Sequence, residues 1–270
     1  MSGRIGAIAW NTFREAVRNK ILYGILVVVV AANFMALVLG EMSLHEETRV
    51  AIDVGLGGMS LFGAITAIVL GVTLLYAEVQ KKTIHVILAK PIERHEVVAG
   101  KYLGMAITLT LLAALFALFL GLLLVVANSM QPAEPARWTQ ALTRAVVLAY
   151  LETLVVAAIA VFFSSFTTPF LSGIFSFALF ALGQTSDEIR GAVDRARDPI
   201  VRGVAKAALR IAPDLHLFSI SGGEVAGHPV SVHGAFVGWG YVGQASLVAL
   251  GWIVGLLLAA MLIFRRRDFV

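Results

Sequence analysis

One carboxylate stands out among the residues that could carry chemistry. Glu152 lies in the middle of an apolar run that extends from Thr139 to Phe163. An ionisable group inside an apolar span is costly, so it is paired with a polar group or serves a function. The sequence offers two partners on other apolar runs, Asn33 and Gln184. Two interpretations remain open: contact with a substrate or a conformational switch, and a hydrogen bond that only joins helices.

The histidines are the next candidates, because neutral imidazole is a common ligand for transition metals. Their spacing matches no metal-ligand motif, and the chain has no cysteine, so neither a disulfide framework nor a thiolate site can form. We therefore expect this chain to bind no metal and no cofactor. The six histidines are His45, His85, His95, His216, His228 and His233.

The sequence contains no complete motif for binding ATP. Its single Gly-Lys pair is Gly100-Lys101, but His95 stands where a P-loop needs its first glycine, and Tyr102 where it needs Ser or Thr. We expect a protein that is not an enzyme and has no ATPase site of its own. The alternative is an integral membrane enzyme acting on lipid or peptide, which would need a cluster of catalytic groups that Glu152 alone does not supply.

The composition predicts a membrane protein. Of its 270 residues, 59% are hydrophobic and 14% are charged, whereas a soluble domain is about half apolar and about a quarter charged. Since about 20 apolar residues cross a bilayer, we expect an all-α membrane protein with six transmembrane helices in one domain, residues 1–270. The fifth run is the shortest and is either little tilted or partly re-entrant. The runs are Ile21–Gly40, Val54–Ala77, Tyr102–Ala127, Thr139–Phe163, Phe170–Gln184 and Ala235–Phe264.

Two amphipathic segments accompany these spans, and polar loops such as Glu41–Asp53 and Asn128–Trp138 join the spans. Residues 1–20 place apolar side chains at helical spacing and include Trp10, which favours an interfacial helix over a plain soluble one. Residues 185–234 precede the last span and are predicted to hold two amphipathic helices at the membrane interface. Pro199 after Asp198 marks the start of the second, because proline is tolerated at the first helical position.

The distribution of basic residues predicts the orientation. Six spans place both termini on one side, which then holds 12 of the 21 Lys and Arg residues close to span ends, so the positive-inside rule makes it cytoplasmic. Residues 78–101 then face the cytoplasm, and residues 185–234 face outward. The absence of cysteine and of a targeting signal fits a bacterial inner membrane, and the net charge of +4 indicates orienting flanks rather than a nucleic-acid partner. The twelve are Arg4, Arg14, Arg18, Lys20, Lys81, Lys82, Lys90, Arg94, Lys101, Arg265, Arg266 and Arg267.

The segment from Glu78 to Lys101 carries the most specific pattern. Residues 83–89 are predicted to form a short helix with Ile84, Ile87 and Leu88 on one side, and Lys90-Pro91 ends it. Residues 93–98 then begin the next helix. A plain basic flanking loop is one interpretation, but it does not explain an apolar face among charges, which favours docking on a protein.

This segment resembles a motif of the ABC-2 type transporter permeases, most closely the subgroup associated with copper-enzyme maturation and gliding motility. The pattern is E-x(4)-T-I-x(3)-L-x-K-P-I-x-R-x-E-x(3)-G-K. It is carried by Glu78, Thr83, Ile84, Leu88, Lys90, Pro91, Ile92, Arg94, Glu96, Gly100 and Lys101. The closing Arg265–Phe269, RRRDF, is similar to the end of chains in that group, and the arrangement of spans matches across essentially the whole chain.

The resemblance implies a permease subunit that couples ATP hydrolysis to export across the membrane. In such transporters two permease chains, here a homodimer, join two cytoplasmic ABC ATPase subunits, which bind ATP and Mg. Residues 78–101 would be the coupling loop that sits in a cleft of the ATPase, with apolar docking by Ile84, Ile87 and Leu88. Lys82, Arg94 and Glu96 would orient it electrostatically. The remaining coupling residues would be Glu78, Thr83, Pro91 and Ile92.

A further hypothesis assumes the same architecture but a function other than transport. The permease could recruit its ATPase for mechanical work on envelope proteins, as a scaffold without a transported substrate. A transporter should show ATPase activity that a substrate stimulates, whereas a scaffold should respond to a protein partner.

Overall fold

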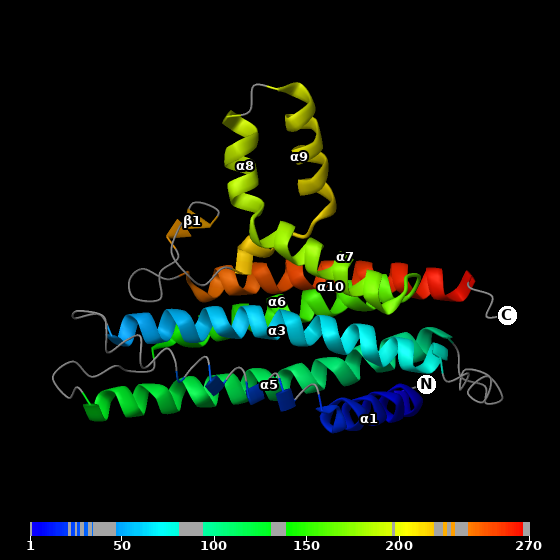
Figure 1. Ribbon diagram of the computed structural model, residues 1–270, viewed down its shortest axis with the longest axis horizontal. Helices are drawn as coiled ribbons and strands as arrows, with labels where there is room; N and C mark the ends of the chain where they lie inside the picture. Colours follow the sequence, from blue (N-terminus) through cyan, green and yellow to red (C-terminus); the bar gives the residue numbers. More distant parts are fainter. Residues whose placement is uncertain are drawn as a thin grey trace.

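The computed structural model shows a bundle of long helices from which a helical hairpin projects (Figure 1). It describes residues 2–20, 47–80, 94–130, 139–195, 198–218, 224–225, 228–229 and 237–266, with scattered helical positions between 23 and 34. The long helices are α3 (Glu47–Gln80), α5 (Arg94–Met130), α6 (Gln140–Ser164) and α10 (Trp239–Arg266). They run side by side in roughly the same direction and pack around α6 as a bundle.

The shorter elements surround this bundle. α1 (Ser2–Arg18) lies along the first turns of α5, and α7 (Pro169–Gln184) lies against α6 and α3. α8 (Ser186–Arg195) and α9 (Pro199–Ile211) form the projecting hairpin, and the 3-10 turn η1 (Leu215–Phe218) returns the chain to the bundle. Within the described residues, the all-α prediction is modified only by the two-residue strands β1 (Glu224–Val225) and β2 (His228–Pro229), paired antiparallel.

Within the part of the chain that the structure describes, four helices are long and apolar enough to cross a membrane, which confirms a multi-pass membrane protein. The qualifying stretches are Ile52–Leu74, His95–Val125, Gln140–Ser164 and Trp239–Ile263. A fifth is counted if α7 and the start of α8 are taken as one broken crossing, bent by 62°. The predicted first span, Ile21–Gly40, lies largely outside the described residues, so the count of six stays a prediction.

The helices extend beyond the apolar runs that predicted them. Residues 47–53 were expected in a loop, but α3 begins at Glu47, and α5 continues to Met130 beyond the predicted end at Ala127. The apolar run marks the part of a helix that lies in lipid, whereas polar flanking residues without a proline simply continue the backbone hydrogen bonding. The predicted loop of residues 78–101 is shortened in the same way, because α3 ends at Gln80 and α5 starts at Arg94.

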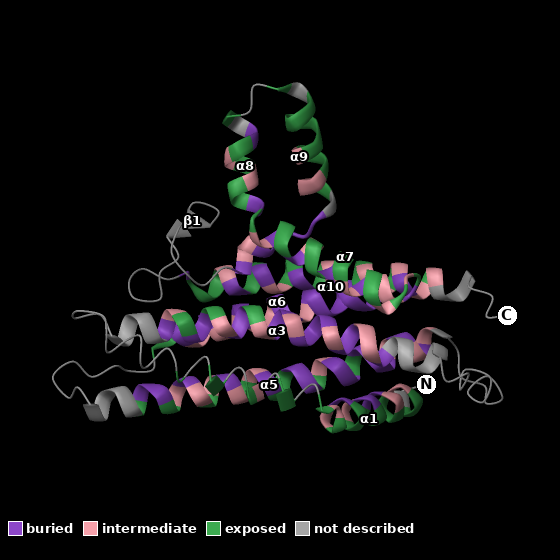
Figure 2. Cartoon of the chain, in the orientation of Figure 1, coloured by how far each residue is buried: buried purple, intermediate pink, exposed green. Residues whose placement is uncertain are grey.

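The core lies around α6. Residues 155–161 are all buried, which requires neighbours on every side of the helix (Figure 2). Small residues permit this packing: a Cβ at Gly71 would lie 2.5 Å from the Cβ of Ala160, and one at Gly63 would lie 2.6 Å from Oγ1 of Thr153. Close backbone approach through small residues is how helices pack in lipid.

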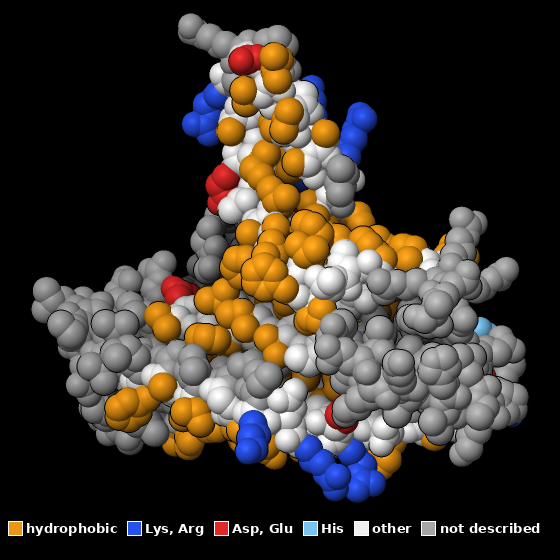
Figure 3. Space-filling model, turned by 45° about the vertical axis from the view of Figure 1, so that its right-hand side comes forward, with side chains coloured by type: hydrophobic (Ala, Val, Ile, Leu, Met, Phe, Trp, Pro, Cys, Tyr) orange, Lys and Arg blue, Asp and Glu red, His pale blue; other side chains and the backbone are white. Residues whose placement is uncertain are grey.

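The hairpin confirms the two amphipathic helices predicted within residues 185–234. Asp198 caps α9, since its carboxylate accepts a hydrogen bond of 2.8 Å from the amide of Ile200, and Pro199 occupies the first turn as predicted. The two helices run across the direction of the long helices rather than along it (Figure 1). One side of the hairpin is apolar, with Ile200, Val201 and Val204 exposed. This apolar strip continues onto the bundle, with Lys and Arg side chains at its edges (Figure 3).

Candidate functional site

Glu152 forms a buried junction between three helices. The residue is 2% exposed and lies in the middle of α6. Its Oε2 accepts a hydrogen bond of 2.8 Å from Oγ of Ser60 on α3, and its Oε1 accepts one from Nε2 of Gln184, the last residue of α7. Nε2 of Gln184 also lies 3.3 Å from Oγ of Ser60. The three side chains therefore join α3, α6 and α7 at one point.

The sequence identified part of this junction. Of the two proposed partners of Glu152, Gln184 makes the contact, and Asn33 lies outside the described residues. Ser60 was missed because α3 holds other hydroxyls that look equivalent in the sequence. Thr66 and Thr73 donate to carbonyl oxygens of their own helix, at Phe62 and Val69. Only the rotation of α3 about its axis relative to α6 distinguishes Ser60 from these threonines.

The junction has the character of an interhelical connection. Both donors, Ser60 and Gln184, are neutral. The three side chains hydrogen-bond to one another in a buried setting, where leaving a polar group without a partner costs free energy. Glu152 and Ser60 are buried, which does not favour direct chemistry on a lipid or peptide. In the part of the chain that the structure describes, no three His, Asp or Glu side chains lie close enough to hold a metal.

α7 buries two serines, one glycine and one phenylalanine and exposes most of its other large apolar residues. Ser172, Ser176, Phe180 and Gly183 are its buried positions. Oγ of Ser172 lies 2.8 Å from Oγ of Ser164 at the end of α6. The large apolar side chains that α7 exposes suit contact with lipid, which surrounds the apolar side of a membrane helix. They are Phe170, Leu171, Ile174, Phe175 and Phe177.

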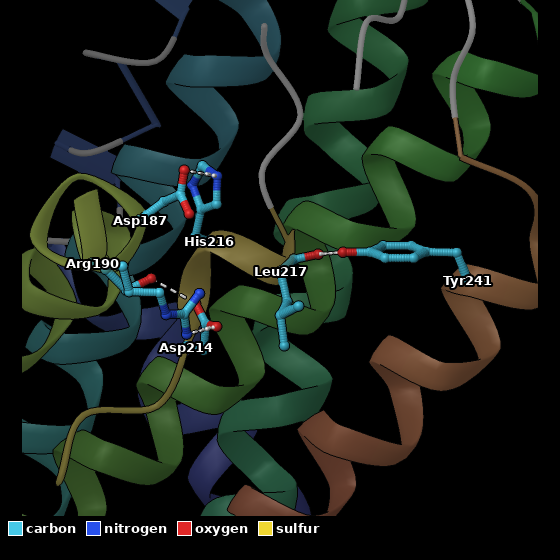
Figure 4. A network of polar contacts seen from close by, with 7 residues as sticks. Asp187, Arg190, Asp214, His216, Leu217 and Tyr241 are labelled. Atoms are coloured by element: carbon cyan, nitrogen blue, oxygen red, sulfur yellow. Dashed lines mark hydrogen bonds and ion pairs between the residues drawn. The ribbon is translucent and has the colours of Figure 1, made fainter. Parts of the chain in front are cut away.

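A polar network fixes the base of the hairpin just beyond Gln184 (Figure 4). The carboxylate of Asp214 accepts a hydrogen bond of 2.6 Å from Oγ of Ser186 and pairs with Arg190. Nε2 of His216 lies 4.0 Å from a carboxylate oxygen of Asp187. Hydroxyl Oη of Tyr241, in the first turn of α10, donates a hydrogen bond of 2.7 Å to the carbonyl of Leu217. The hairpin is therefore held to α10 as well as to α7.

Gly183 brings the two ends of the hairpin into contact. A Cβ at this position would lie 2.7 Å from the carbonyl oxygen of Pro213 and 2.7 Å from Cγ of Leu215. Any larger residue would force the returning chain away from α7. The hairpin base and the Glu152 junction are thus adjacent parts of one assembly, because Gly183 precedes Gln184 directly.

The start of α5 is tied to the end of α3 on one side and to α1 on the other. Nζ of Lys101 is buried and donates a hydrogen bond to the carbonyl of Leu74 on α3. A Cβ at Gly100 would lie 2.7 Å from Cβ of Ile8, and one at Gly104 would lie 2.5 Å from the carbonyl oxygen of Ala9. The Gly-Lys pair that closes the sequence motif therefore serves as a packing joint for α1, α3 and α5.

The structure reaches only the two ends of the predicted coupling loop. Glu78 belongs to the last turn of α3, and Arg94 is the first residue of α5. Glu96 is 2% exposed and lies one turn before Gly100. The other expected coupling residues lie outside the described residues: Lys82, Thr83, Ile84, Ile87, Leu88, Pro91 and Ile92.

Comparison with known proteins adds one finding to this geometry. A family model described as "ABC-2 family transporter protein" matches residues 6–185. The matched region is 180 of the 270 residues and includes α3, α5, α6, α7 and nearly all of α1. No curated protein matches the chain.

Proposed function

The chain belongs to the ABC-2 transporter family, and we propose that it is an exporting permease subunit driven by a separate cytoplasmic ATPase. In this proposal the complete transporter contains two copies of the chain and two ATPase subunits, which bind ATP and Mg. It lies in a bacterial inner membrane with both termini in the cytoplasm. Within the family, the sequence motif favours the subgroup associated with copper-enzyme maturation and gliding motility.

The observation that carries the proposal is the joint between α3 and α5. These are the two longest helices that the structure describes, with 34 and 37 residues, and residues 81–93 connect them. Lys101 links the first turns of α5 to Leu74 of α3 just below that connection. A displacement of residues 81–93 would therefore move both helices together rather than bend one of them.

A continuous set of contacts leads from this joint to the hairpin. α3 carries Ser60, which reaches Glu152 and Gln184, and Gln184 is followed directly by the hairpin. Movement of α3 along its axis would change the hydrogen bonds of Glu152 first and the position of α7 second. We infer that Glu152 and Gln184 relay the ATPase cycle to the hairpin, which would shape an outer gate.

The coupling residues keep the roles that the family resemblance implies, with one change. Ile84, Ile87 and Leu88 would dock in the ATPase, and Lys82 and Arg94 would orient the contact by charge. Glu96 is buried, so we propose that it acts by holding the first turns of α5. Glu78, Thr83, Pro91 and Ile92 would shape the rest of the loop.

The test is co-purification of the ATPase with a variant of the loop. Ile87→Asp places a charge on the apolar docking face, so the ATPase should be lost from mild-detergent preparations while the chain still folds. Ile200→Asp is the matched control, because Ile200 is 73% exposed on the hairpin, away from the loop. The coupling assignment is wrong if the Ile87→Asp chain, correctly folded, retains the ATPase in the same amount as the control.

A further inference from the structure

α1 presents three different faces. Ala9, Thr12 and Ala16 are buried and form the face that packs on α5. Trp10 is 58% exposed, and its ring lies 5.4 Å from the ring of Phe13, so a second face is apolar and uncovered. A third face is polar and lines a pocket. It consists of Asn11, Arg14, Glu15, Arg18 and Asn19.

The contacts with α5 place α1 at a boundary of the membrane. The apolar stretch of α5 begins at His95 and has 31 residues, so it is about 46 Å long. The hydrocarbon core is about 30 Å thick, so the first turns of that stretch lie at the level of the headgroups. Gly100 and Gly104, on which α1 packs, are about 8 Å and about 14 Å from its start.

The polar face carries two uncommitted positive charges. Arg14 and Arg18 are four residues apart, so they lie on the same side of α1 on successive turns. Both are exposed, and neither forms a hydrogen bond or ion pair with any residue that the structure describes. Among the described residues that line the pocket, Glu15 is the one acid, against the two arginines. In the space-filling view, Lys and Arg side chains gather along the edge where α1 lies (Figure 3).

We propose that this surface binds an anionic phospholipid. The guanidinium groups of Arg14 and Arg18 would hold the phosphate by charge-assisted hydrogen bonds, and Asn11 would donate to the headgroup. The acyl chains would lie against Trp10 and Phe13, which form the face of α1 next to the arginines. A soluble anion would satisfy the arginines but leave the aromatic face in water, whereas a phospholipid satisfies both.

The test uses the fluorescence of Trp10 in the full chain. The variant Trp138→Phe, Trp239→Phe, Trp252→Phe leaves Trp10 as the single reporter, reconstituted in bilayers of phosphatidylcholine with phosphatidylglycerol. Either lipid is brominated near the top of its acyl chains, because bromine quenches only tryptophans that it contacts. Brominated phosphatidylglycerol should quench Trp10 at a mole fraction about 25-fold lower than brominated phosphatidylcholine, since Arg14 and Arg18 each contribute about a fivefold preference for anionic lipid.

Charge variants decide whether the preference comes from this surface. Adding Arg14→Gln and Arg18→Gln should remove the preference while quenching by phosphatidylcholine persists. The control Lys206→Gln with Arg210→Gln removes two exposed charges from α9 and should leave the preference intact. Equal quenching by both lipids, or a preference that survives the α1 substitutions, would overturn the proposal.

A second measurement keeps the proposal testable if the tryptophan variant does not fold. The chain with all four tryptophans is purified in mild detergent, and its bound lipids are quantified by mass spectrometry. Phosphatidylglycerol should be enriched over its fraction in the source membrane, and Arg14→Gln with Arg18→Gln should reduce that enrichment severalfold. An unchanged lipid profile would count against a lipid site at this face of α1.

Discussion

Gln184, the last residue of α7, donates a hydrogen bond to the carboxyl group of Glu152, which is twelve residues from each end of α6. The contact fixes the end of one helix to the midpoint of another. It also includes Ser60 of α3, so three segments that are far apart in the sequence depend on one acidic side chain. The first prediction concerns this residue.

Replacing Glu152 by leucine should destabilise the folded chain more than replacing it by glutamine. Leucine leaves Ser60 and Gln184 only their 3.3 Å contact with each other, and the loss of the shared acceptor costs about 1–3 kcal/mol, whereas glutamine keeps the shape and one acceptor oxygen. Interhelical hydrogen bonds in membranes average about 0.6 kcal/mol, so we expect about 1–2 kcal/mol for leucine and less for glutamine. Unfolding in a denaturing detergent, followed by circular dichroism, measures both; equal stability of the two variants would show that the junction does not hold the helices.

Gly104→Ala should displace α1 from α5. A Cβ there would lie 2.5 Å from the backbone oxygen of Ala9 and 2.6 Å from Cβ of Thr12, and neither atom belongs to the end of a flexible side chain. Overpacking of this kind costs about 1–3 kcal/mol. Cleavage by trypsin at Arg14 and Arg18 should become faster than in the parent chain. Gly6→Ala on α1 is the control, because nothing lies within 4 Å of a Cβ at that position; faster cleavage in both variants would contradict the packing argument.

Lys101→Met should leave ATPase binding intact but reduce the stimulation of ATPase activity by the permease. The substitution keeps the aliphatic volume but removes the donor to Leu74, so α3 and α5 lose a connection near residues 81–93. We expect the ATPase to co-purify as before, while stimulation of its activity by the permease falls severalfold. Lys101→Arg retains a donor and should be affected less. If a stably folded Lys101→Met chain stimulates the ATPase fully, the hydrogen bond between Lys101 and Leu74 is not needed for coupling.

The orientation can be tested with single cysteines, because the chain has none of its own. Lys206→Cys on the exposed side of α9 should react with a membrane-impermeant maleimide in intact cells. Ile87→Cys should react only after the membrane is opened, since the basic flanks predict that residues 78–101 face the cytoplasm. The reverse pattern of labelling would invert the predicted topology.

The sequence predicted the elements better than their ends and contacts. Apolar runs located α3, α5, α6 and α10, because a helix in lipid must be apolar over its whole crossing. They did not locate the start of α3 at Glu47, since polar residues outside the lipid continue a helix without any break in pattern. The short fifth run left two alternatives open, little tilt or a partly re-entrant segment, and the structure bends by 62° between α7 and the start of α8.

The candidate site was also predicted only in part, because the sequence does not show which helices pack together. The isolation of Glu152 among apolar residues identified it, and Gln184 followed as a polar group at the end of another run. The burial of Glu96 was not predictable, because the sequence shows a polar residue beside a loop but not the helix packed over it. The role of Gly100 and Gly104 was hidden in the same way, since only the position of α1 explains why no side chain fits there.

The shortness of α7 has a consequence for the surrounding bilayer. Its 16 residues span about 24 Å, against about 37 Å for the 25 residues of α6, and its last residue meets α6 at the midpoint. Ser186 and Arg190 follow within two turns and contact Asp214 of the returning chain, so charged groups begin where a full crossing would still be in hydrocarbon. Lipid does not solvate such groups, so the leaflet beside the hairpin must thin, or water must enter it, to reach them. We therefore expect the membrane next to this protein to be thinner, or more hydrated, on the α7 side than elsewhere around the bundle.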